Sequence, residues 1–181
     1  MDVYLLMKKL KKQLLDFVVD ELTNSIRNTI SGDSFLTEVS KFTHQDTKSI
    51  TKKNGWLFNW KSELNDDKRE VFKLTIVHNL HIIQGLLSVS RESDHIFMHL
   101  LENAPFNIGD NKLYEGVAGN LVAYACKLSF QYGFEGFVAF TAKTKLIKHY
   151  ENSLGAYHLG GHKMIIPTNS AQFLVNKYFK T

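Results

Sequence analysis

A turn of small residues, Gly116–Asn120, constrains what this chain can fold into more than any other stretch. It follows an apolar, strand-like run at His95–Leu101 and leads into a long helical pattern from Leu121 onward. A helix that starts from such a turn has backbone N–H groups without intrahelical partners, at the positive end of its dipole. A pyrophosphate is favoured there, and small side chains let it reach the backbone. The turn predicts either a phosphate-binding site or a place of close helix packing.

The turn does not match two common phosphate motifs. A P-loop places Lys-Ser/Thr directly after its last glycine, whereas Asn120 and Leu121 follow Gly119 here. The dinucleotide-binding pattern has its second glycine where Ala118 stands, and it lies near the start of a βαβ unit. Neither a P-loop nor a dinucleotide site is therefore predicted.

The composition predicts one folded domain over residues 1–181. Hydrophobic residues make up 44% of the chain, with 13 Phe and 7 Tyr, which is enough for a core of its own. The single cysteine, Cys126, cannot form an internal disulfide, so a reducing, cytoplasmic location is expected. No apolar run approaches the roughly 18 residues of a membrane span, and neither a membrane anchor nor a signal peptide is expected.

The net charge of +4 owes much to Lys8, Lys9, Lys11 and Lys12 near the N-terminus. Apolar residues around these lysines recur at helical spacing, which predicts a basic amphipathic helix. Such a helix can lie on a membrane or a nucleic acid, but a solvated surface helix is the more common case. Because the chain lacks an aromatic-basic platform and a recognisable reading helix, no nucleic-acid or membrane partner is expected.

The first half of the chain predicts mainly strands. One is expected over Asp16–Ile26, followed by polar loops over Arg27–Gly55 with a short helix near Ser34–Lys41. Four further strand-like runs are expected to form an antiparallel meander. These runs are Trp56–Trp60, Val71–Val77, His81–Ser90 and His95–Leu101.

The last third predicts alternating helices and strands. A helix is expected over Asn120–Tyr132, ended by Gly133, and Asn169 with Gln172 predicts the cap of a last helix that ends near Phe179. Between these helices lie a strand, a helix and another strand: Phe134–Phe140, Thr144–Asn152 and Lys163–Ile166. A meander followed by β-α-β-α-β predicts an α+β domain with a mixed sheet.

Four segments between His81 and Gly161 occur in an order and at spacings typical of one family. They are Ile82–Leu87, His95–Pro105, Gly116–Gly119 and His149–Gly155. In this order they resemble the third strand, the fourth strand, the pyrophosphate motif and the Tyr-x-x-x-Gly-Phe helix signature of the GNAT superfamily of N-acetyltransferases. The helix after the motif ends at Gly133, which is also the family's usual spacing.

The resemblance implies a GNAT-like acyl-CoA N-acyltransferase fold, in which helices flank a central mixed, twisted sheet. Its fourth and fifth strands, here His95–Leu101 and Phe134–Phe140, would be splayed apart with the acetyl donor, acetyl-CoA, between them. Residues 1–80 would form the acceptor-side half and residues 81–181 the acetyl-CoA-binding half. The implied cofactor-binding residues are Leu101, Glu102, Gly116, Val117, Ala118, Gly119, Asn120, Leu121, Lys143 and Tyr150.

The implied reaction is direct attack of a primary amine on the acetyl thioester in a ternary complex. An ammonium with a pKa near ~10 must first lose a proton, and Glu102 is the first candidate for the base, with His99 second. Because side chains alternate along a strand, only one of the two should face the cleft. The backbone N–H near Leu101 or Glu102 would stabilise the carbonyl oxygen, and Tyr150 would give a proton to the departing thiolate. The implied catalytic residues are Tyr150, Glu102 and His99.

The acceptor is expected to be a small-molecule or peptide amine, and a homodimer is one possible assembly. Its site would be built chiefly from Thr23–Thr43 and Trp56–Trp60. No metal site is expected, because His158 and His162 have no Cys/His cluster around them.

A catalytically silent GNAT-like module, which binds an acyl-CoA or a partner without turnover, is the alternative. It stays open because two positions depart from the family's pattern. Leu113 stands where the family has Gln or Arg, and Lys143 stands where it often has Asn.

Overall fold

The computed structural model describes residues 13–22 and 25–179. The predicted basic helix around residues 8–12 lies outside the described residues. A seven-stranded sheet has the order β3-β4-β5-β6-β8-β10-β9, and a small sheet has the order β2-β1-β7. The large sheet comprises β3 (Thr37–Lys41), β4 (Glu70–Ile76), β5 (Asn79–Arg91), β6 (Ile96–Asn103), β8 (Val138–Thr141), β10 (Lys163–Ile166) and β9 (Tyr157–Gly160). The small sheet comprises β1 (Ile26–Asn28), β2 (Ser34–Phe35) and β7 (Tyr114–Glu115).

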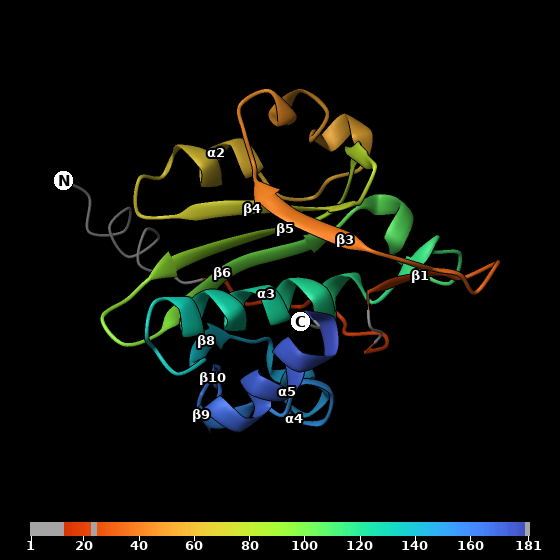
Figure 1. Ribbon diagram of the computed structural model, residues 1–181. Helices are drawn as coiled ribbons and strands as arrows, with labels where there is room; N and C mark the ends of the chain where they lie inside the picture. Colours follow the sequence, from red (N-terminus) through yellow and green to blue (C-terminus); the bar gives the residue numbers. More distant parts are fainter. Residues whose placement is uncertain (1–12, 23–24, 180–181) are drawn as a thin grey trace.

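Helices cover both faces of the large sheet (Figure 1). The α-helices are α2 (Trp60–Asn65), α3 (Val117–Gln131), α4 (Ile147–Leu154) and α5 (Thr168–Tyr178), and the short 3₁₀ helices are η1 (Asp46–Lys48), η2 (Lys52–Asn54), η3 (Pro105–Asn107) and η4 (Thr144–Leu146). α3 packs on β5 and β6, where a Cβ at Gly85 would lie 2.8 Å from Val117. The glycine therefore lets α3 approach the sheet closely. Ser88, on the other face of β5, donates a hydrogen bond to Glu63 of α2 at 2.7 Å.

The fourth and fifth strands of the large sheet, β6 and β8, pair only at their starts. They are parallel at Ile96 with Val138 and at Phe97 with Ala139. Beyond these positions β6 continues to Asn103 with β5 as its ladder partner, so an opening widens between β6 and β8. The other neighbouring strands of the large sheet are antiparallel. The α+β class and the splayed, mixed sheet predicted from the resemblance are confirmed.

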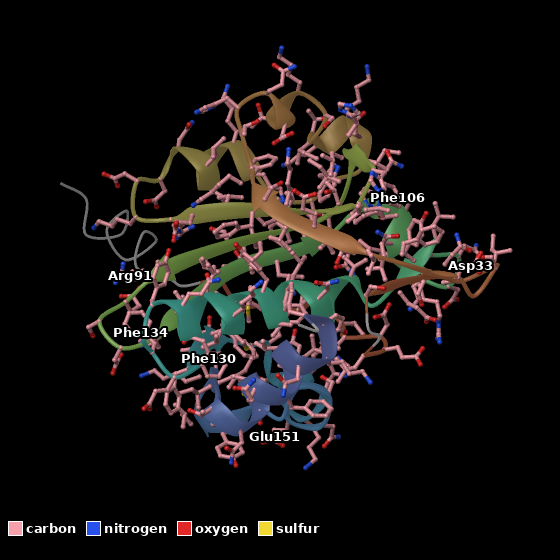
Figure 2. The ribbon with its side chains drawn as sticks, viewed as in Figure 1. Asp33, Arg91, Phe106, Phe130, Phe134 and Glu151 are labelled. Carbon is pink, nitrogen blue, oxygen red and sulfur yellow. The ribbon has the colours of Figure 1, made fainter. Side chains whose placement is uncertain are left out.

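Cation–π contacts join the end of β5 to the turn that follows α3. The guanidinium carbon of Arg91 lies 4.3 Å from the ring centroid of Tyr132 and 5.7 Å from that of Phe134. Figure 2 places Arg91 and Phe134 beside each other, where the turn after α3 meets the end of β5. These contacts hold the turn against the sheet before β8 begins.

Most elements from β4 onward were predicted correctly. β4, β5, β6 and β10 lie where strands were expected, and α3 ends before Gly133, whose φ is +78°. β8 begins at Val138 rather than at Phe134, because Glu135 and Gly136 also have positive φ and form a tight turn. The predicted Asn169 cap is wrong: α5 starts at Thr168 after Pro167, without a side-chain cap. The short strands β7 and β9 were not predicted.

Three predictions in the first half are wrong. In the predicted strand Asp16–Ile26, the described residues 16–22 form no strand ladder; the isolated bridge lies at Leu15, just before them, and the strand β1 begins only at Ile26. Ser34–Lys41 is not helical, because β3 pairs with β4 from Thr37 opposite Ile76 onward. Trp56–Trp60 is not a strand: Asn59 accepts a hydrogen bond from the Ser62 amide and starts α2. In each case a partner distant in sequence, or a cap, outweighs the local pattern.

None of the helices among the described residues is both long and apolar enough to cross a membrane.

Candidate functional site

Residues 13–22, which we call the cleft segment, lie in the opening between β6 and β8. The Leu15 amide donates to the Thr141 carbonyl at 2.7 Å, and the Lys143 amide donates to the Leu15 carbonyl at 3.0 Å. The Thr141 hydroxyl also donates to the Gln13 carbonyl at 2.9 Å. Leu15 and Ala142 thereby form a parallel bridge. The cleft segment thus pairs with the end of β8, where β6 has moved away.

The cleft segment presents alternate side chains to the core. Leu15, Phe17 and Val19 are buried, whereas Val18 between them is 56% exposed. The Phe17 ring packs against two aromatic rings, with centroid distances of 4.8 Å to Tyr150 and 6.4 Å to Phe140. This alternation is that of a strand, although the segment has no full ladder.

Tyr150, a predicted catalytic residue, is engaged by the cleft segment. Its ring is fully buried, and its hydroxyl donates to the Phe17 carbonyl at 2.6 Å. Burial, with a smaller contribution from the nearby charge of Asp16, raises the pKa of the Tyr150 phenol well above its usual range. His149, its neighbour on α4, accepts a hydrogen bond from the Val19 amide at 2.9 Å. The Tyr150 phenol is therefore protonated, and it donates its hydrogen bond to the Phe17 carbonyl of the cleft segment.

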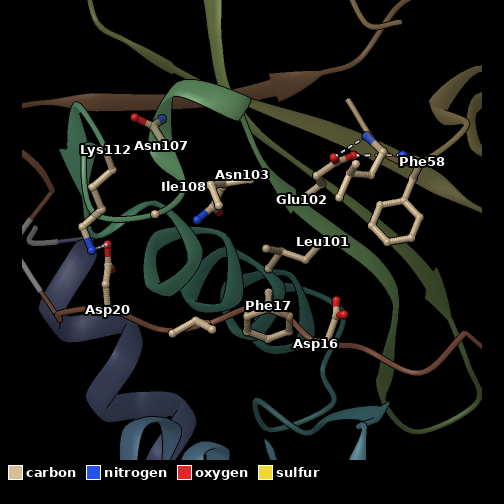
Figure 3. Close-up of a pocket in the computed structure, with 13 residues that line it drawn as sticks. Asp16, Phe17, Asp20, Phe58, Leu101, Glu102, Asn103, Asn107, Ile108 and Lys112 are labelled. Atoms are coloured by element: carbon tan, nitrogen blue, oxygen red, sulfur yellow. Dashed lines mark hydrogen bonds and ion pairs between the residues drawn. The ribbon is translucent and has the colours of Figure 1, made fainter. Parts of the chain in front are cut away.

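Asp20 of the cleft segment lies at the N-terminus of α3. Its carboxylate accepts a hydrogen bond from the Gly116 amide at 3.0 Å and forms an ion pair with Lys112, also at 3.0 Å. Gly116 is the N-cap of α3 and has a φ of +92°. The end of a helix with free N–H groups favours an anion, and here a side-chain carboxylate is that anion. The small-residue turn thus has an anionic partner from within the chain (Figure 3).

Two further contacts hold the ends of the cleft segment. Lys143, a predicted cofactor residue, forms an ion pair with Asp16 at 2.6 Å. Glu21 forms an ion pair with Arg27, which also pairs with Glu115 beside the turn. The acidic residues of the segment thus meet basic residues from three separate elements.

The other predicted cofactor residues lie in the buried first turn of α3 or on β6. Val117, Ala118, Gly119, Asn120 and Leu121 are buried, and Leu101 borders the opening. A Cβ at Gly119 would lie 2.2 Å from the Tyr178 hydroxyl oxygen of α5, so this glycine allows helix packing. The Asn120 side-chain amide donates to the Thr37 hydroxyl at 2.8 Å, which ties α3 to β3.

A cavity of about 430 Å³ lies between the cleft segment and the end of β6 (Figure 3). Its lining comprises residues 16–18, 20, 57–58, 101–103, 107–109 and 112. Of the predicted acceptor region, Leu57 and Phe58 line this cavity, whereas no described residue of 25–43 does. Asp16 and Asp20 are paired with Lys143 and Lys112, so Glu102 is the carboxylate of this lining that has no ion pair among the described residues.

Glu102, the first candidate for the base, lines this cavity but is 4% exposed. Its carboxylate accepts hydrogen bonds from the Leu57 amide at 2.7 Å, the Phe58 amide at 3.3 Å and the Trp60 indole N–H at 2.8 Å. These donors are neutral, and no ion pair involves Glu102 in the described part of the chain. The hydrogen bonds to this carboxylate therefore come from two backbone amides and one indole N–H.

Asn103, the next residue of β6, adds an unpaired acceptor to the cavity lining. Its buried side-chain oxygen has no hydrogen-bond partner among residues 13–22 and 25–179. Figure 3 shows Asn103 at the same end of β6 as Glu102. A ligand with a donor group can satisfy this atom.

His99, the second candidate for the base, lies at a bulge of β6. The β5–β6 register shifts between Ser88 and Val89, which leaves His99 as an extra residue between Met98 and Leu100. Its Nε2 lies 2.6 Å from the Ser90 hydroxyl, and its ring contacts Phe97. It is not part of the cavity lining, so of the two candidates Glu102 alone borders the cavity.

The site as described does not fit acetyl-CoA together with the cleft segment. The resemblance assigns the Gly116 amide, Lys143 and Tyr150 to the donor, and each is bonded to residues 13–22 instead. Sequence reasoning missed Asp16 and Asp20, which it assigned to an ordinary strand. The signal available was the run Asp16–Asp20 itself, in which two carboxylates flank a short apolar stretch.

No group of three or more His, Cys, Asp or Glu side chains suited to a metal ion occurs in the described ranges.

Comparison with known proteins identifies the fold. No protein-family model matches the sequence, and no curated protein matches it. Among solved structures, spermidine N-acetyltransferase from Vibrio cholerae in complex with CoA and spermine has a TM-score of 0.51 at 13% identity, covering 75% of this chain and 98% of its own. The ribosomal-protein-S18-alanine N-acetyltransferase from Escherichia coli has a TM-score of 0.50 at 12% identity, covering 72% and 90%.

A third similar structure is a mutant of the AtaT toxin bound to the C-terminus of the antitoxin AtaR and acetyl-CoA. Its TM-score is 0.51 at 13% identity, and the match covers 76% of this chain and 97% of that chain. The chain therefore has the fold of the GNAT N-acetyltransferases, as the sequence resemblance implied.

Proposed function

We propose that this chain is an acetyl-CoA-dependent N-acetyltransferase of a primary amine, and that the donor binds in the opening between β6 and β8. The observation that carries the proposal is the position of this opening, which leads to a helix N-terminus with an anion on it. The similar structures from Vibrio cholerae and of AtaT were determined with CoA or acetyl-CoA. A pyrophosphate has the charge that the N-terminus of α3 favours.

The amine site in this proposal is the acceptor side of the cavity, around Glu102. A buried carboxylate without a cationic partner attracts an ammonium group, and Leu57 and Phe58 offer apolar contact to the rest of the amine. Glu102 would then take the proton of the amine directly or through a water molecule. In this proposal Leu57 and Phe58 contribute one wall of the amine site and Glu102 of β6 contributes the other, while β8, Tyr150 and the N-terminus of α3 form the donor site.

Tyr150 would serve as the proton donor to the leaving thiolate. Its raised pKa keeps the phenol protonated, and its hydroxyl is free for this role once Phe17 leaves. The proposed enzyme therefore works only in a state in which the cleft segment has moved out of the opening. This state is expected in the cytoplasm, where acetyl-CoA is present.

The test is the release of free thiol from acetyl-CoA in the presence of a panel of primary amines. The wild-type chain should release thiol with at least one amine, and Tyr150→Phe should lower the rate about 100-fold. The matched control is Tyr157→Phe on β9, whose side chain is 63% exposed; it should keep the wild-type rate. Equal rates for both variants would remove Tyr150 from the mechanism.

The second candidate is a catalytically silent module. It is favoured by the engagement of two of the three predicted catalytic residues: Glu102 accepts three hydrogen bonds, and the Tyr150 hydroxyl is bonded to Phe17. Binding of CoA without thiol release across the whole panel, by a variant in which the cleft segment is weakened, would establish this candidate instead.

A further inference from the structure

We propose that the cleft segment, residues 13–22, is an intramolecular competitor of acyl-CoA, which occupies the donor site and must leave before a CoA molecule binds. The inference rests on the proposed function, because it concerns the regulation of the same site. It is carried by three independent sets of contacts: those of the backbone, of one carboxylate and of the buried side chains.

The backbone contacts use the free edge of β8. In a splayed sheet, the end of β8 offers N–H and C=O groups that β6 does not pair. The Leu15 amide donates a hydrogen bond to the Thr141 carbonyl, and the Leu15 carbonyl accepts one from the Lys143 amide, which is the pattern of an added parallel strand. An extended acyl-CoA arm that added itself to this edge would need the same groups.

The carboxylate contact is made at the N-terminus of α3, where the Gly116 amide and Lys112 form what we call the anion seat. The Asp20 carboxylate accepts a hydrogen bond from the Gly116 amide and forms an ion pair with Lys112, and its side chain is only 14% exposed. A phosphate group bound at this helix N-terminus would need the same amide and the same lysine. The Asp20 carboxylate and a phosphate group cannot both bind at this helix N-terminus, because two negative charges so close together repel each other.

The buried side chains make the occupation specific. Phe17 and Leu15 lie in the core, and the Phe17 carbonyl accepts a hydrogen bond from the Tyr150 hydroxyl. A loop that merely crossed the opening would not both pack a ring against Tyr150 and Phe140 and accept the hydrogen bond of the buried Tyr150 hydroxyl. The cleft segment therefore has anchors of its own at both ends of the opening and at its middle.

Competition of this kind lowers the apparent affinity for CoA by the fraction of molecules with an open site. Any change that weakens the cleft segment should then tighten CoA binding, which is opposite to the usual effect of damaging a site. Asp20→Asn should tighten CoA about threefold to tenfold, measured by calorimetric titration. Asp33→Asn, at the tip of the β1–β2 loop (Figure 2), should leave the affinity unchanged.

The decisive experiment locks the cleft segment in place. Leu15 and Ala142 are bridge partners, and neighbouring strands lie about 4.8 Å apart, within the range of about 4.4–6.8 Å that a disulfide spans. The double variant Leu15→Cys/Ala142→Cys is titrated with CoA after oxidation and again after reduction. Oxidation should weaken CoA binding at least tenfold, and reduction should restore it. Leu15→Cys alone, treated in the same way, is the control.

Equal CoA affinity of the oxidised and reduced forms would overturn the competition and leave the proposed function standing. Tight CoA binding by the reduced form and loss of binding on oxidation, without thiol release for any amine, would support the competition and overturn the proposed enzyme. Absence of CoA binding in every form, Asp20→Asn included, would overturn both. If the disulfide does not form, the comparison of Asp20→Asn with Asp33→Asn decides: equal affinities overturn the competition.

Discussion

The two sides of the opening between β6 and β8 differ in how their polar groups are satisfied. On the donor side, which comprises the end of β8, Tyr150 and the N-terminus of α3, the cleft segment supplies a partner to each. On the acceptor side, which comprises the end of β6 with Glu102 and Asn103, a cavity remains, and the Asn103 side-chain oxygen has no partner in the described part of the chain. The buried Asn120 side-chain oxygen, in the first turn of α3, also lacks a partner there. Under the proposed function, the difference predicts that access of the donor, rather than access of the amine, is limiting in the state described.

The largest effect is expected on the acceptor side. Glu102→Gln should lower the rate of acetyl transfer by about 100-fold or more, because the amide cannot take a proton from the amine. It should also lower the free energy of unfolding by about 1–3 kcal/mol, since an amide cannot accept from all three donors around it. CoA affinity should not change, because Glu102 has no contact with the anion seat.

Measuring both thiol release and CoA affinity on the same preparation of Glu102→Gln checks that the rate falls while the affinity stays unchanged. Glu135→Gln, in the exposed turn before β8, is the control for both. A loss of CoA affinity in Glu102→Gln would mean that the two sides of the opening do not act separately.

The next effect is expected on the donor side and has the opposite sign. Phe17→Ala removes the buried anchor of the cleft segment, and burial of such a side chain contributes about 1.5–3 kcal/mol. CoA should therefore bind about tenfold more tightly, by calorimetric titration. Phe173→Ala on α5, where the ring is 59% exposed, should not change the affinity. Weaker CoA binding by Phe17→Ala would mean that Phe17 supports the donor site instead of blocking it.

The sequence predicted the frame of this site but not what fills it. β4, β5, β6, β10 and α3 follow from apolar periodicity and from Gly133, which are local signals. The cleft segment was assigned to a strand because Phe17, Val18 and Val19 are apolar, yet its partners lie more than 90 residues away, at Gly116 and His149. A single sequence does not contain the information that pairs such distant residues. Asp20 therefore could not be connected with the turn that it caps.

A smaller effect distinguishes the two aspartates of the cleft segment. Asp16 pairs with Lys143 at the surface, where both side chains are 42% exposed, and such pairs contribute about 0–1 kcal/mol. Asp16→Asn should tighten CoA binding by less than about threefold, below the effect of Asp20→Asn. Titration of the two variants side by side checks the order. A larger effect for Asp16→Asn would place the main anchor at β8 rather than at α3.

The smallest effect concerns stability in acid, away from the donor side. Burial alone would raise the pKa of Asp46, but hydrogen bonds from Lys73 and Thr43 outweigh it and hold the pKa below its ordinary value of 3.8. A carboxyl with a lowered pKa contributes stability above its unfolded pKa and loses it as the pH falls through the folded value. Asp46→Asn should therefore lower the unfolding midpoint in urea at pH 6 and have less effect near pH 3.

The exposed Asp67→Asn, after α2, is the control for Asp46→Asn. An unfolding midpoint that Asp46→Asn lowers equally at both pH values would show that the ionised pair with Lys73 is not the source of the stability.

The central claim, that the donor side is closed by residues 13–22, is tested most directly by hydrogen exchange of the wild-type protein with and without saturating CoA. The amides of Leu15 and Val19 are hydrogen-bonded in the state described, to Thr141 and His149. Competition predicts that CoA speeds exchange in residues 13–22 while it slows exchange in residues 116–121. Slower or unchanged exchange in residues 13–22, together with protection of residues 116–121, would contradict it.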